Sequence, residues 1–247
     1  MRPLLTSLAL GITLCAPVRA ERKTAIFVAD GFDFPVGKPD GEGYYKARGY
    51  TPNGHLGEDW NGRGGGDTDL GDPVYSTAHG IVLFAKNYYH GWGNVVIVRH
   101  AYQEGGQTKF ADSLYGHLDK IGVRYGQHVK RGQLVGTIGT GGGIYPAHLH
   151  FEIRKDIRVG MARGSFPKDD SVYWSGTLFI TAHRKLATAN ATVLAPIDTF
   201  SAATGKADEP DEPRGFVLPP RATPPPKPGG TVPGRYDDLR KALEGKK

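Results

Sequence analysis

Residues 147–153 are Ala147-His148-Leu149-His150-Phe151-Glu152-Ile153, in which one histidine stands on each side of Leu149. Successive side chains of a β-strand point to opposite faces, so His148 and His150 would share one face while Leu149 and Phe151 share the other. The first face then presents two imidazoles, which are common ligands of transition metals. The second face is apolar and suits a core. A surface strand with two incidental histidines is the alternative for this motif taken alone.

The remainder of the chain predicts an all-β fold with few helices. Between residues 73 and 138, short runs rich in Val and Ile alternate with glycine-punctuated turns, and no stretch shows a sustained helical period. The 36 glycines among 247 residues also favour a turn-rich β architecture over a helical bundle. Later in the chain, further short strands are expected around Tyr173-Trp174 and over Thr177 to Ile180.

Composition divides the chain into four segments. Residues 1–20 predict a signal peptide, because a largely apolar run follows Arg2 and a small residue precedes Glu21. Residues 21–50 form a lead-in segment in which one strand is expected, and residues 51–200 form the main domain. Residues 201–247 are rich in proline and are expected to be a disordered tail. A short helix at Tyr236 to Leu243 and a protein partner for this tail are open alternatives.

Cysteine content and charge limit the chemistry. Cys15 is the only cysteine and lies in the predicted signal peptide, so the exported chain would have no disulfide and no thiolate metal ligand. The formal net charge is +6, and loss of residues 1–20 removes two arginines and no acids, which leaves +4. This modest excess suits an anionic polymer such as cell wall but does not indicate nucleic acid. The apolar run within residues 1–20 is too short for a comfortable transmembrane helix, and no stable membrane span is expected after signal cleavage.

Two further histidine motifs precede residue 147. His55 and Asp59 stand four residues apart, but the two nearby glycines disfavour a helix, so an extended or looped stretch is expected. The second motif, Tyr115-Gly116-His117-Leu118, ends a predicted strand. Between the two motifs, residues 62–72 are rich in glycine and aspartate. Their spacing does not match a calcium-binding loop, so we expect a solvated turn.

In this order, His55-xxx-Asp59, Tyr115-Gly116-His117-Leu118 and His148-Leu149-His150 resemble the lysostaphin and LytM-type zinc metallopeptidases of the M23 family. The similarity covers about residues 50–155 and includes the runs 72–76, 79–82, 126–133 and 139–142. The resemblance implies an open antiparallel β-sheet groove of the LytM/lysostaphin type, barrel-sandwich-like in architecture. It also implies a zinc ion held by His55, Asp59 and His150, and two unliganded active-site histidines, His117 and His148.

This donor set suits hydrolysis on chemical grounds. Two imidazole nitrogens and one carboxylate oxygen leave a tetrahedral zinc ion one open position, and zinc lowers the pKa of a water bound there. The chain has no His-Glu-x-x-His motif, so a histidine must handle the proton. We assign His117 to orient or deprotonate the water and His148 to stabilise the oxyanion or protonate the leaving amine, but the sequence does not decide which histidine has which role. Glu152 would be either a partner of a ligand histidine or a surface carboxylate.

Other candidate residues carry weaker signals. Residues 139–143 are expected to form a tight turn, to leave room for a substrate backbone, or both. The following histidines match no ligand spacing and are expected to be structural or solvated: His79, His90, His100, His128 and His183. The following aromatic residues are expected either to line a substrate groove or to pack in the core: Tyr88, Tyr89, Trp92 and Tyr145.

The sequence therefore predicts an exported zinc endopeptidase, periplasmic or extracellular, that cuts peptide cross-links of peptidoglycan. A non-catalytic wall-binding or regulatory module is the main alternative, because intact ligands do not prove turnover. A biotinyl or lipoyl carrier domain is disfavoured because no modified-lysine motif accompanies the similar turn at residues 127–136. A non-haem iron oxygenase is disfavoured by the His55-xxx-Asp59 spacing. The sequence does not distinguish a D-alanyl cross-link from a glycine bridge.

Overall fold

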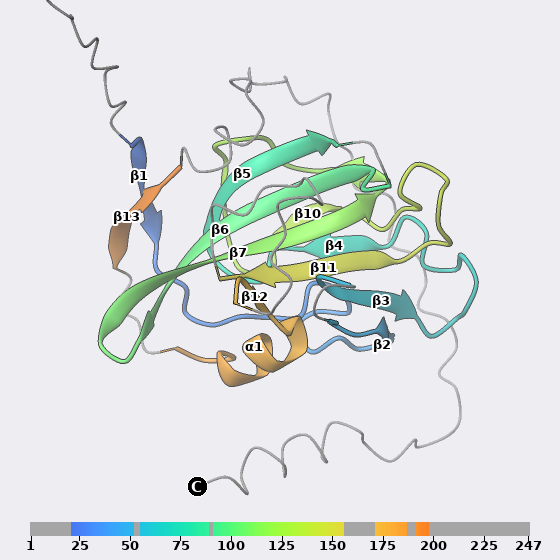
Figure 1. Ribbon diagram of the computed structural model, residues 1–247, viewed down its shortest axis with the longest axis horizontal. Helices are drawn as coiled ribbons and strands as arrows, with labels where there is room; N and C mark the ends of the chain where they lie inside the picture. Colours follow the sequence, from blue (N-terminus) through green and yellow to red (C-terminus); the bar gives the residue numbers. More distant parts are fainter. Residues whose placement is uncertain (1–20, 52–54, 89–90, 156–170, 187–190, 198–247) are drawn as a thin grey trace, which may run out of the picture. The chain divides into compact units, whose positions relative to one another are not determined.

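A computed structural model describes residues 21–51, 55–88, 91–155, 171–186 and 191–197 (Figure 1). All of these residues belong to one compact unit, Met1–Arg214. The predicted signal peptide, the proline-rich tail with its expected short helix, Tyr89 and His90 lie outside the described residues. No helix in the described ranges is long and apolar enough to cross a membrane.

The described residues form thirteen β-strands and one α-helix, as the sequence predicted for an all-β chain. In chain order the elements are β1 (Lys23–Phe27), β2 (Tyr44–Arg48), β3 (Glu58–Gly62), β4 (Pro73–Tyr75), β5 (Gly80–Asn87), β6 (Asn94–Glu104), β7 (Gln107–Leu118), β8 (Lys120–Ile121), β9 (His128–Val129), β10 (Leu134–Thr137), β11 (Leu149–Arg154), β12 (Tyr173–Trp174), α1 (Gly176–Ala182) and β13 (Thr192–Pro196).

The largest sheet has the strand order β2-β3-β11-β7-β6-β5-β9, and β12 extends the pairing of β11 beyond β3. Its neighbouring strands run antiparallel throughout, which confirms the predicted open antiparallel sheet. A smaller sheet has the order β4-β10-β8, and β1 pairs with β13 in a third. Figure 1 shows β11 lying between β3 and β7, so the histidine strand occupies the interior of the large sheet.

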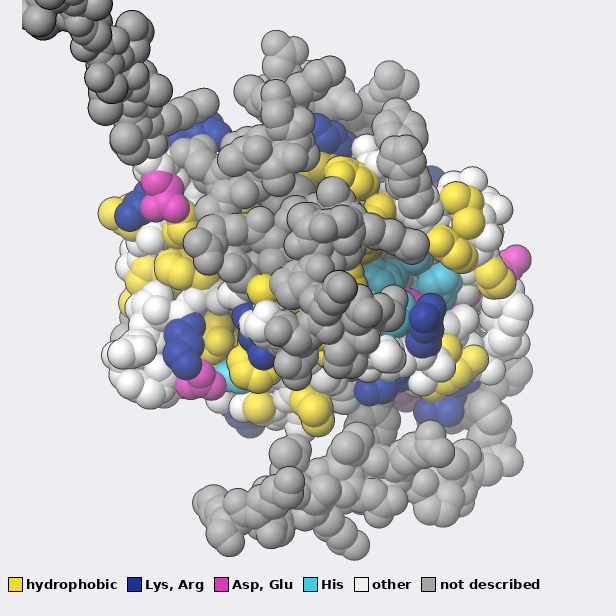
Figure 2. All heavy atoms as spheres, viewed as in Figure 1, with side chains coloured by type: hydrophobic (Ala, Val, Ile, Leu, Met, Phe, Trp, Pro, Cys, Tyr) yellow, Lys and Arg dark blue, Asp and Glu magenta, His cyan; other side chains and the backbone are white. Residues whose placement is uncertain are grey.

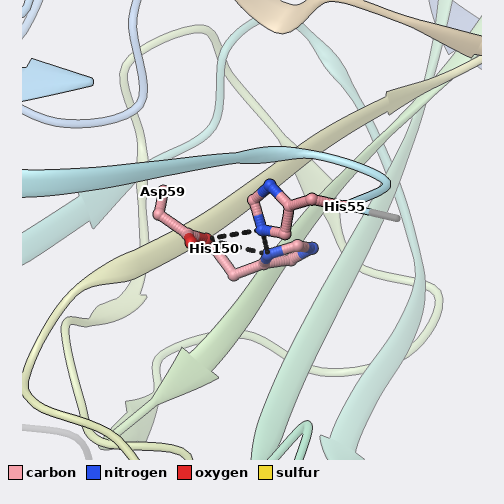
Figure 3. Close-up of side chains that lie close together, drawn as sticks. All are labelled: His55, Asp59 and His150. Carbon is pink, nitrogen blue, oxygen red and sulfur yellow. Dashed lines mark hydrogen bonds and ion pairs between the residues drawn. The ribbon is translucent and has the colours of Figure 1, made fainter. Parts of the chain in front are cut away.

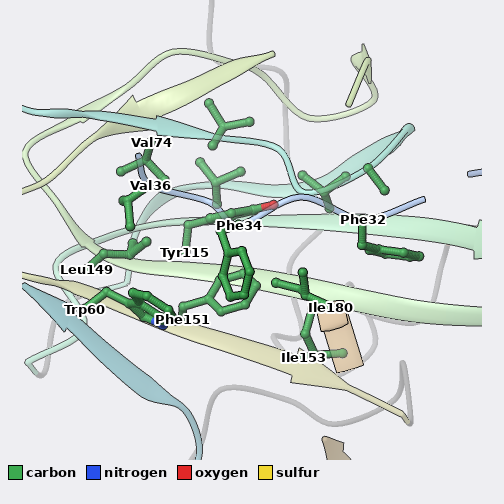
Figure 4. Packing of buried hydrophobic residues seen from close by; sticks show 14 of the residues in the cluster. Phe32, Phe34, Val36, Trp60, Val74, Tyr115, Leu149, Phe151, Ile153 and Ile180 are labelled. Atoms are coloured by element: carbon green, nitrogen blue, oxygen red, sulfur yellow. The ribbon is translucent and has the colours of Figure 1, made fainter. Parts of the chain in front are cut away.

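One face of β11 builds the main hydrophobic core. Leu149, Phe151 and Ile153 are buried there, and Trp60 and Tyr115 belong to the same cluster (Figure 4). Full burial of a side chain such as Phe151 stabilises a protein by about 1.5–3 kcal/mol. Because strand side chains alternate, the opposite face of β11 carries His150, Glu152 and Arg154.

The lead-in segment contributes more structure than the sequence predicted. It forms two strands rather than one: β1 pairs with β13, and β2 pairs with β3 at the edge of the large sheet. Between these strands, Phe32, Phe34 and Val36 are buried in the same core as β11. This segment therefore packs with the strands that carry the histidine motifs.

Residues 171–186 confirm one expected strand and overturn the other. β12 forms at Tyr173–Trp174, but the strand expected over Thr177 to Ile180 is wrong, because these residues belong to α1. The buried carboxylate of Glu58 accepts hydrogen bonds from the backbone N–H of Thr177 (3.1 Å) and from its hydroxyl (2.7 Å). The helix buries Phe179 and Ile180 in the core. These tertiary contacts outweigh the strand preference of Thr, Phe and Ile.

Candidate metal centre

Strand register brings the first histidine motif to the second. His150 on β11 lies opposite Asp59 on β3, so the two side chains project from the same sheet face. His55 lies three residues before β3 and forms a backbone bridge with Thr51, and a bend at residues 56–57 leads into the strand, which confirms the extended or looped stretch expected for residues 55–59. Figure 3 shows the three side chains converging on one point.

The three converging atoms are His55 Nε2, Asp59 Oδ1 and His150 Nδ1. Asp59 Oδ1 lies 3.0 Å from His55 Nε2 and 3.1 Å from His150 Nδ1. The two imidazole nitrogens are themselves 3.1 Å apart. Among the residues that the structure describes, this is the one group of three His, Cys, Asp or Glu side chains arranged to hold a metal ion.

The outer partners of the two ligand rings determine which nitrogen faces the centre. His55 Nδ1 lies 3.0 Å from the carbonyl of Gly49, and His150 Nε2 lies 3.0 Å from Glu152 Oε1. Carbonyl and carboxylate oxygens only accept, so these outer ring nitrogens donate, and in the neutral rings His55 Nε2 and His150 Nδ1 carry the lone pairs that face the centre. Two lone pairs this close repel unless a cation lies between them. The donor set therefore fits a metal ion.

The electrostatics of the centre also favour positive charge. Burial alone would raise the pKa of Asp59, but hydrogen bonds and charge from the protonated rings of His150 and His55 hold it below its usual range. Burial would lower the pKa of His150, but Asp59 and Glu152 outweigh burial and raise it to about 9. A site that retains a proton this strongly also stabilises a bound cation.

Glu152 lies beneath the centre and is not a surface carboxylate. It is fully buried, with Oε1 on His150 and Oε2 2.7 Å from Arg154 Nε. Burial raises the pKa of Glu152, but the charge of Arg154 and the contact with His150 lower it overall. The buried arginine therefore keeps Glu152 ionised, and Glu152 orients His150. Arg154 is a site residue that was not predicted from the sequence, although its position two residues after Glu152 on the same strand face was a usable signal.

His117 and His148 adjoin the three converging residues. The His117 ring lies 4.9 Å from the ring of His148 and 5.4 Å from that of His150, measured between centroids. His148 directly precedes β11, and its Nε2 lies 3.6 Å from Asp59 Oδ1. The fold thus brings all five residues expected at the site into one cluster. On the face shown in Figure 2, histidine side chains reach the surface beside hydrophobic and basic side chains.

Backbone carbonyls fix the orientation of both additional histidines. His117 Nδ1 donates to the carbonyl of Trp92 (3.2 Å), and His148 Nδ1 donates to that of Pro146 (2.8 Å). The neutral form of each ring therefore has its lone pair on Nε2. Burial, with the neighbouring His150 and His148, lowers the pKa of His117 to about 3, so its ring is neutral at neutral pH. These two acceptors are backbone carbonyls, which every residue has, so the sequence could not predict them.

The loops around the site match their predictions in different degrees. Residues 139–143 form the expected turn into β11, and Gly139 pairs with His148 through a backbone bridge. The loop at 62–72 is mostly exposed, as expected for a solvated turn, but Asp67 accepts a hydrogen bond from the backbone N–H of Ala147 (2.7 Å). This contact anchors the residue that precedes His148.

The aromatic residues divide between the site and the core. The Trp92 ring packs edge-on against His150 with 5.4 Å between centroids, and the Tyr145 ring lies 4.8 Å from that of His117. Tyr145 remains 37% exposed, so it borders the site. Tyr88 packs instead against a buried cluster that includes Phe84.

The other described histidines have structural or solvated positions, as expected. His100 is buried, with Nε2 2.7 Å from the Ser113 hydroxyl, and His183 Nε2 lies 2.9 Å from Glu104. His79 lies near Asp30, and His128 is exposed on β9. None of these four belongs to the metal-binding group.

The sequence profile of Peptidase family M23 matches residues 55–161, which include all five site residues. Lipoprotein NlpD of Yersinia enterocolitica is 38% identical to this chain over 84 residues, which cover 34% of this chain and 78% of NlpD. This chain belongs to Peptidase family M23. The site described above lies within the matched region.

Other relatives of this M23 chain are longer proteins. Peptidoglycan DD-endopeptidase ShyA of Vibrio cholerae is 38% identical over 104 residues, which cover 42% of this chain and 22% of ShyA. The chain thus spans about a fifth of that relative's length. A crystal structure of a zinc-containing peptidase from Vibrio cholerae is also similar, with 32% identity and a TM-score of 0.40. It matches over 51% of this chain and 37% of that one.

Proposed function

We propose that this M23 chain is an exported zinc endopeptidase that hydrolyses peptide cross-links of bacterial peptidoglycan. The observation that carries the proposal is the convergence of two imidazole nitrogens and one carboxylate oxygen, all within 4.8 Å of one another. Two further histidines adjoin this group, which suits hydrolysis better than metal storage. The name of ShyA, a peptidoglycan DD-endopeptidase, favours a D-alanyl cross-link over a glycine bridge as the bond that is cut.

Each residue of the site has a defined task in this proposal. His55, Asp59 and His150 would hold the zinc ion, which when bound supplies a water of lowered pKa and polarises the peptide carbonyl. His117 donates its Nδ1–H to the carbonyl of Trp92 and presents Nε2 to the site, so it would accept the proton of the attacking water. His148 Nε2 lies 3.6 Å from Asp59 Oδ1 at the same centre, and in its protonated form it would donate a hydrogen bond to the developing oxyanion or a proton to the leaving amine.

A regulatory module is the second candidate. Murein hydrolase activator NlpD of Escherichia coli is 38% identical over 84 residues, so the relatives include a protein named for activating another hydrolase. Activation of another hydrolase would not require His117 and His148 to present their Nε2 atoms to the metal-binding group. The presence of both rings beside the metal-binding group therefore favours the enzyme.

Digestion of purified peptidoglycan tests the proposal. The protein is incubated with the polymer after zinc loading or after treatment with a chelator, and the released fragments are identified by mass spectrometry. We expect loss of cross-linked fragments only in the zinc-loaded sample, with new ends at the D-alanyl bond. Bound zinc at one ion per chain without any cleavage would refute the enzyme and favour the regulatory module.

A further inference from the structure

His117 has an unusual backbone conformation. Its φ angle is +62°, and among the described residues no other non-glycine residue has a positive φ. L-residues rarely adopt this left-handed region, so surrounding structure must impose it. The strained residue is also the one whose ring adjoins both His148 and His150.

Two loops form hydrogen bonds to His117 through their backbone atoms. The carbonyl of Trp92 accepts hydrogen bonds from both the backbone N–H (2.9 Å) and the ring Nδ1–H (3.2 Å) of His117. From the other side, the N–H of Gly141 donates to the carbonyl of His117 (3.3 Å). The loop at Trp92 thus holds both the ring and the backbone of His117, and the loop at Gly141 binds the carbonyl of the same residue.

The two loops touch each other behind His117 at glycines. Gly93 and Gly141 both have φ +62°, and a Cβ on Gly93 would lie 2.8 Å from Gly141 Cα. A Cβ on Gly141 would lie 2.9 Å from Tyr145 Cδ2 and 3.2 Å from His117 Nδ1. The contact leaves no room for a side chain, so one added carbon must push the loops apart or rotate the His117 ring.

We propose that Gly93 and Gly141 are positioning residues that lock His117 in one tautomer. The close packing of the loops keeps Trp92 O on Nδ1, so that Nε2 alone is presented to the site. A ring released from this carbonyl would be free to protonate Nε2 and would then no longer accept a proton there. The expected effect on turnover rests on the proposed peptidase function, whereas the expected tautomer of His117 does not.

The test compares Gly141→Ala with Gly105→Ala in the zinc-loaded protein. Gly105 has φ +60° in the turn between β6 and β7, and a Cβ there meets nothing within 4 Å. Both variants therefore carry the same backbone strain, but only Gly141→Ala crowds His117. Long-range ¹H–¹⁵N NMR reports which ring nitrogen of His117 is protonated, and zinc content and thermal stability are measured alongside.

We expect Nδ1 to carry the proton in the wild type and in Gly105→Ala, and a mixture of tautomers in Gly141→Ala. Misplacement of a catalytic group by about 1 Å can cost about 10²-fold in rate, so a shift of tenths of an ångström should lower kcat about 10-fold. The KM and the zinc content should stay unchanged. A single Nδ1–H tautomer in Gly141→Ala, with kcat equal to that of Gly105→Ala, would overturn the inference.

The NMR spectrum of the wild-type protein provides a second test of the His117 tautomer. If Gly141→Ala fails to fold, an Nε2–H tautomer of His117 in the wild-type protein would still overturn the inference. If the wild type shows the Nδ1–H tautomer but does not cleave peptidoglycan, the proposed enzyme fails while the positioning of His117 stands.

Discussion

Replacement of Glu152 by glutamine should weaken metal binding through His150. The change removes one buried negative charge and keeps the shape of the side chain. Both neighbours of this carboxylate donate to it: His150 Nε2 at 3.0 Å and Arg154 Nε at 2.7 Å. An amide has one oxygen and one NH₂ group, so it satisfies only one of these donors and turns a donor toward the other.

The charge of Arg154 determines the outcome. A charged donor takes the better acceptor, so the amide oxygen should face Arg154 and the NH₂ group should face His150. His150 must then accept at Nε2 and carry its proton on Nδ1, the atom that faces Asp59 and His55. Loss of an outer partner typically costs about 10- to 100-fold in metal affinity, equivalent to about 1.4–2.8 kcal/mol. This tautomer change places the expected loss near the upper end.

The assay is a competition titration of zinc against a chromophoric chelator, with urea unfolding of the metal-free protein as a stability measure. Glu104→Gln is the matched control, because Glu104 also contacts a histidine Nε2, that of His183 at 2.9 Å, and a basic side chain, that of Lys109. Glu104 is exposed and belongs to no metal group, so this variant should bind zinc like the wild type.

Two measurements on Glu152→Gln keep affinity separate from folding. The metal-free variant should also unfold more readily, because breaking a buried ion pair costs about 3–5 kcal/mol in proteins. Zinc affinity equal to that of Glu104→Gln in a folded Glu152→Gln protein would refute the role of Glu152 in orienting His150.

Three further predictions follow from the site and the core. His150→Ala should lose both zinc and activity, and a variant that retains one zinc ion per chain would contradict its role as a ligand. His117→Ala should retain zinc but lose about 10²- to 10⁴-fold in turnover, as expected for a general base; near-wild-type turnover would contradict that role. Burial lowers the pKa of His100 from 6.5 to about 4, so its contribution to stability is present above pH 6.5 and declines as the pH falls toward 4. The contribution of His100 to this decline is about 3 kcal/mol by linkage, so stability should fall by that much less in His100→Asn than in the wild type when urea unfolding is followed between pH 7 and 4.

The sequence predicted the histidine strand because its signal is local. The alternation of His148, Leu149, His150 and Phe151 has the two-residue period of a strand, and that period alone separates a polar face from a core face. The structure confirms this separation, with Leu149 and Phe151 in the core and His150 on the opposite face. The resemblance to the M23 family added the expectation that His55, Asp59 and His150 would meet.

Long-range contacts explain what the sequence did not predict. The residues at Thr177 to Ile180 have strand propensity, yet they form a helix because Glu58, more than a hundred residues earlier, binds the N–H of Thr177. Similarly, residues 21–50 resembled an irregular lead-in, but their strands pair with β3 and β13. Neither partner is readable from the local composition of these segments.

The sequence by itself determined the residue types that can hold a metal and the strand that follows His148 and carries His150. Tertiary structure alone decided which ring nitrogen each histidine presents, because the deciding partners are backbone carbonyls and one buried ion pair. Trp92 O fixes His117, and Glu152, held by Arg154, fixes His150. Both tautomers of histidine are the same amino acid in the sequence. Only the surrounding atoms determine which ring nitrogen carries the proton and which can bind a metal ion.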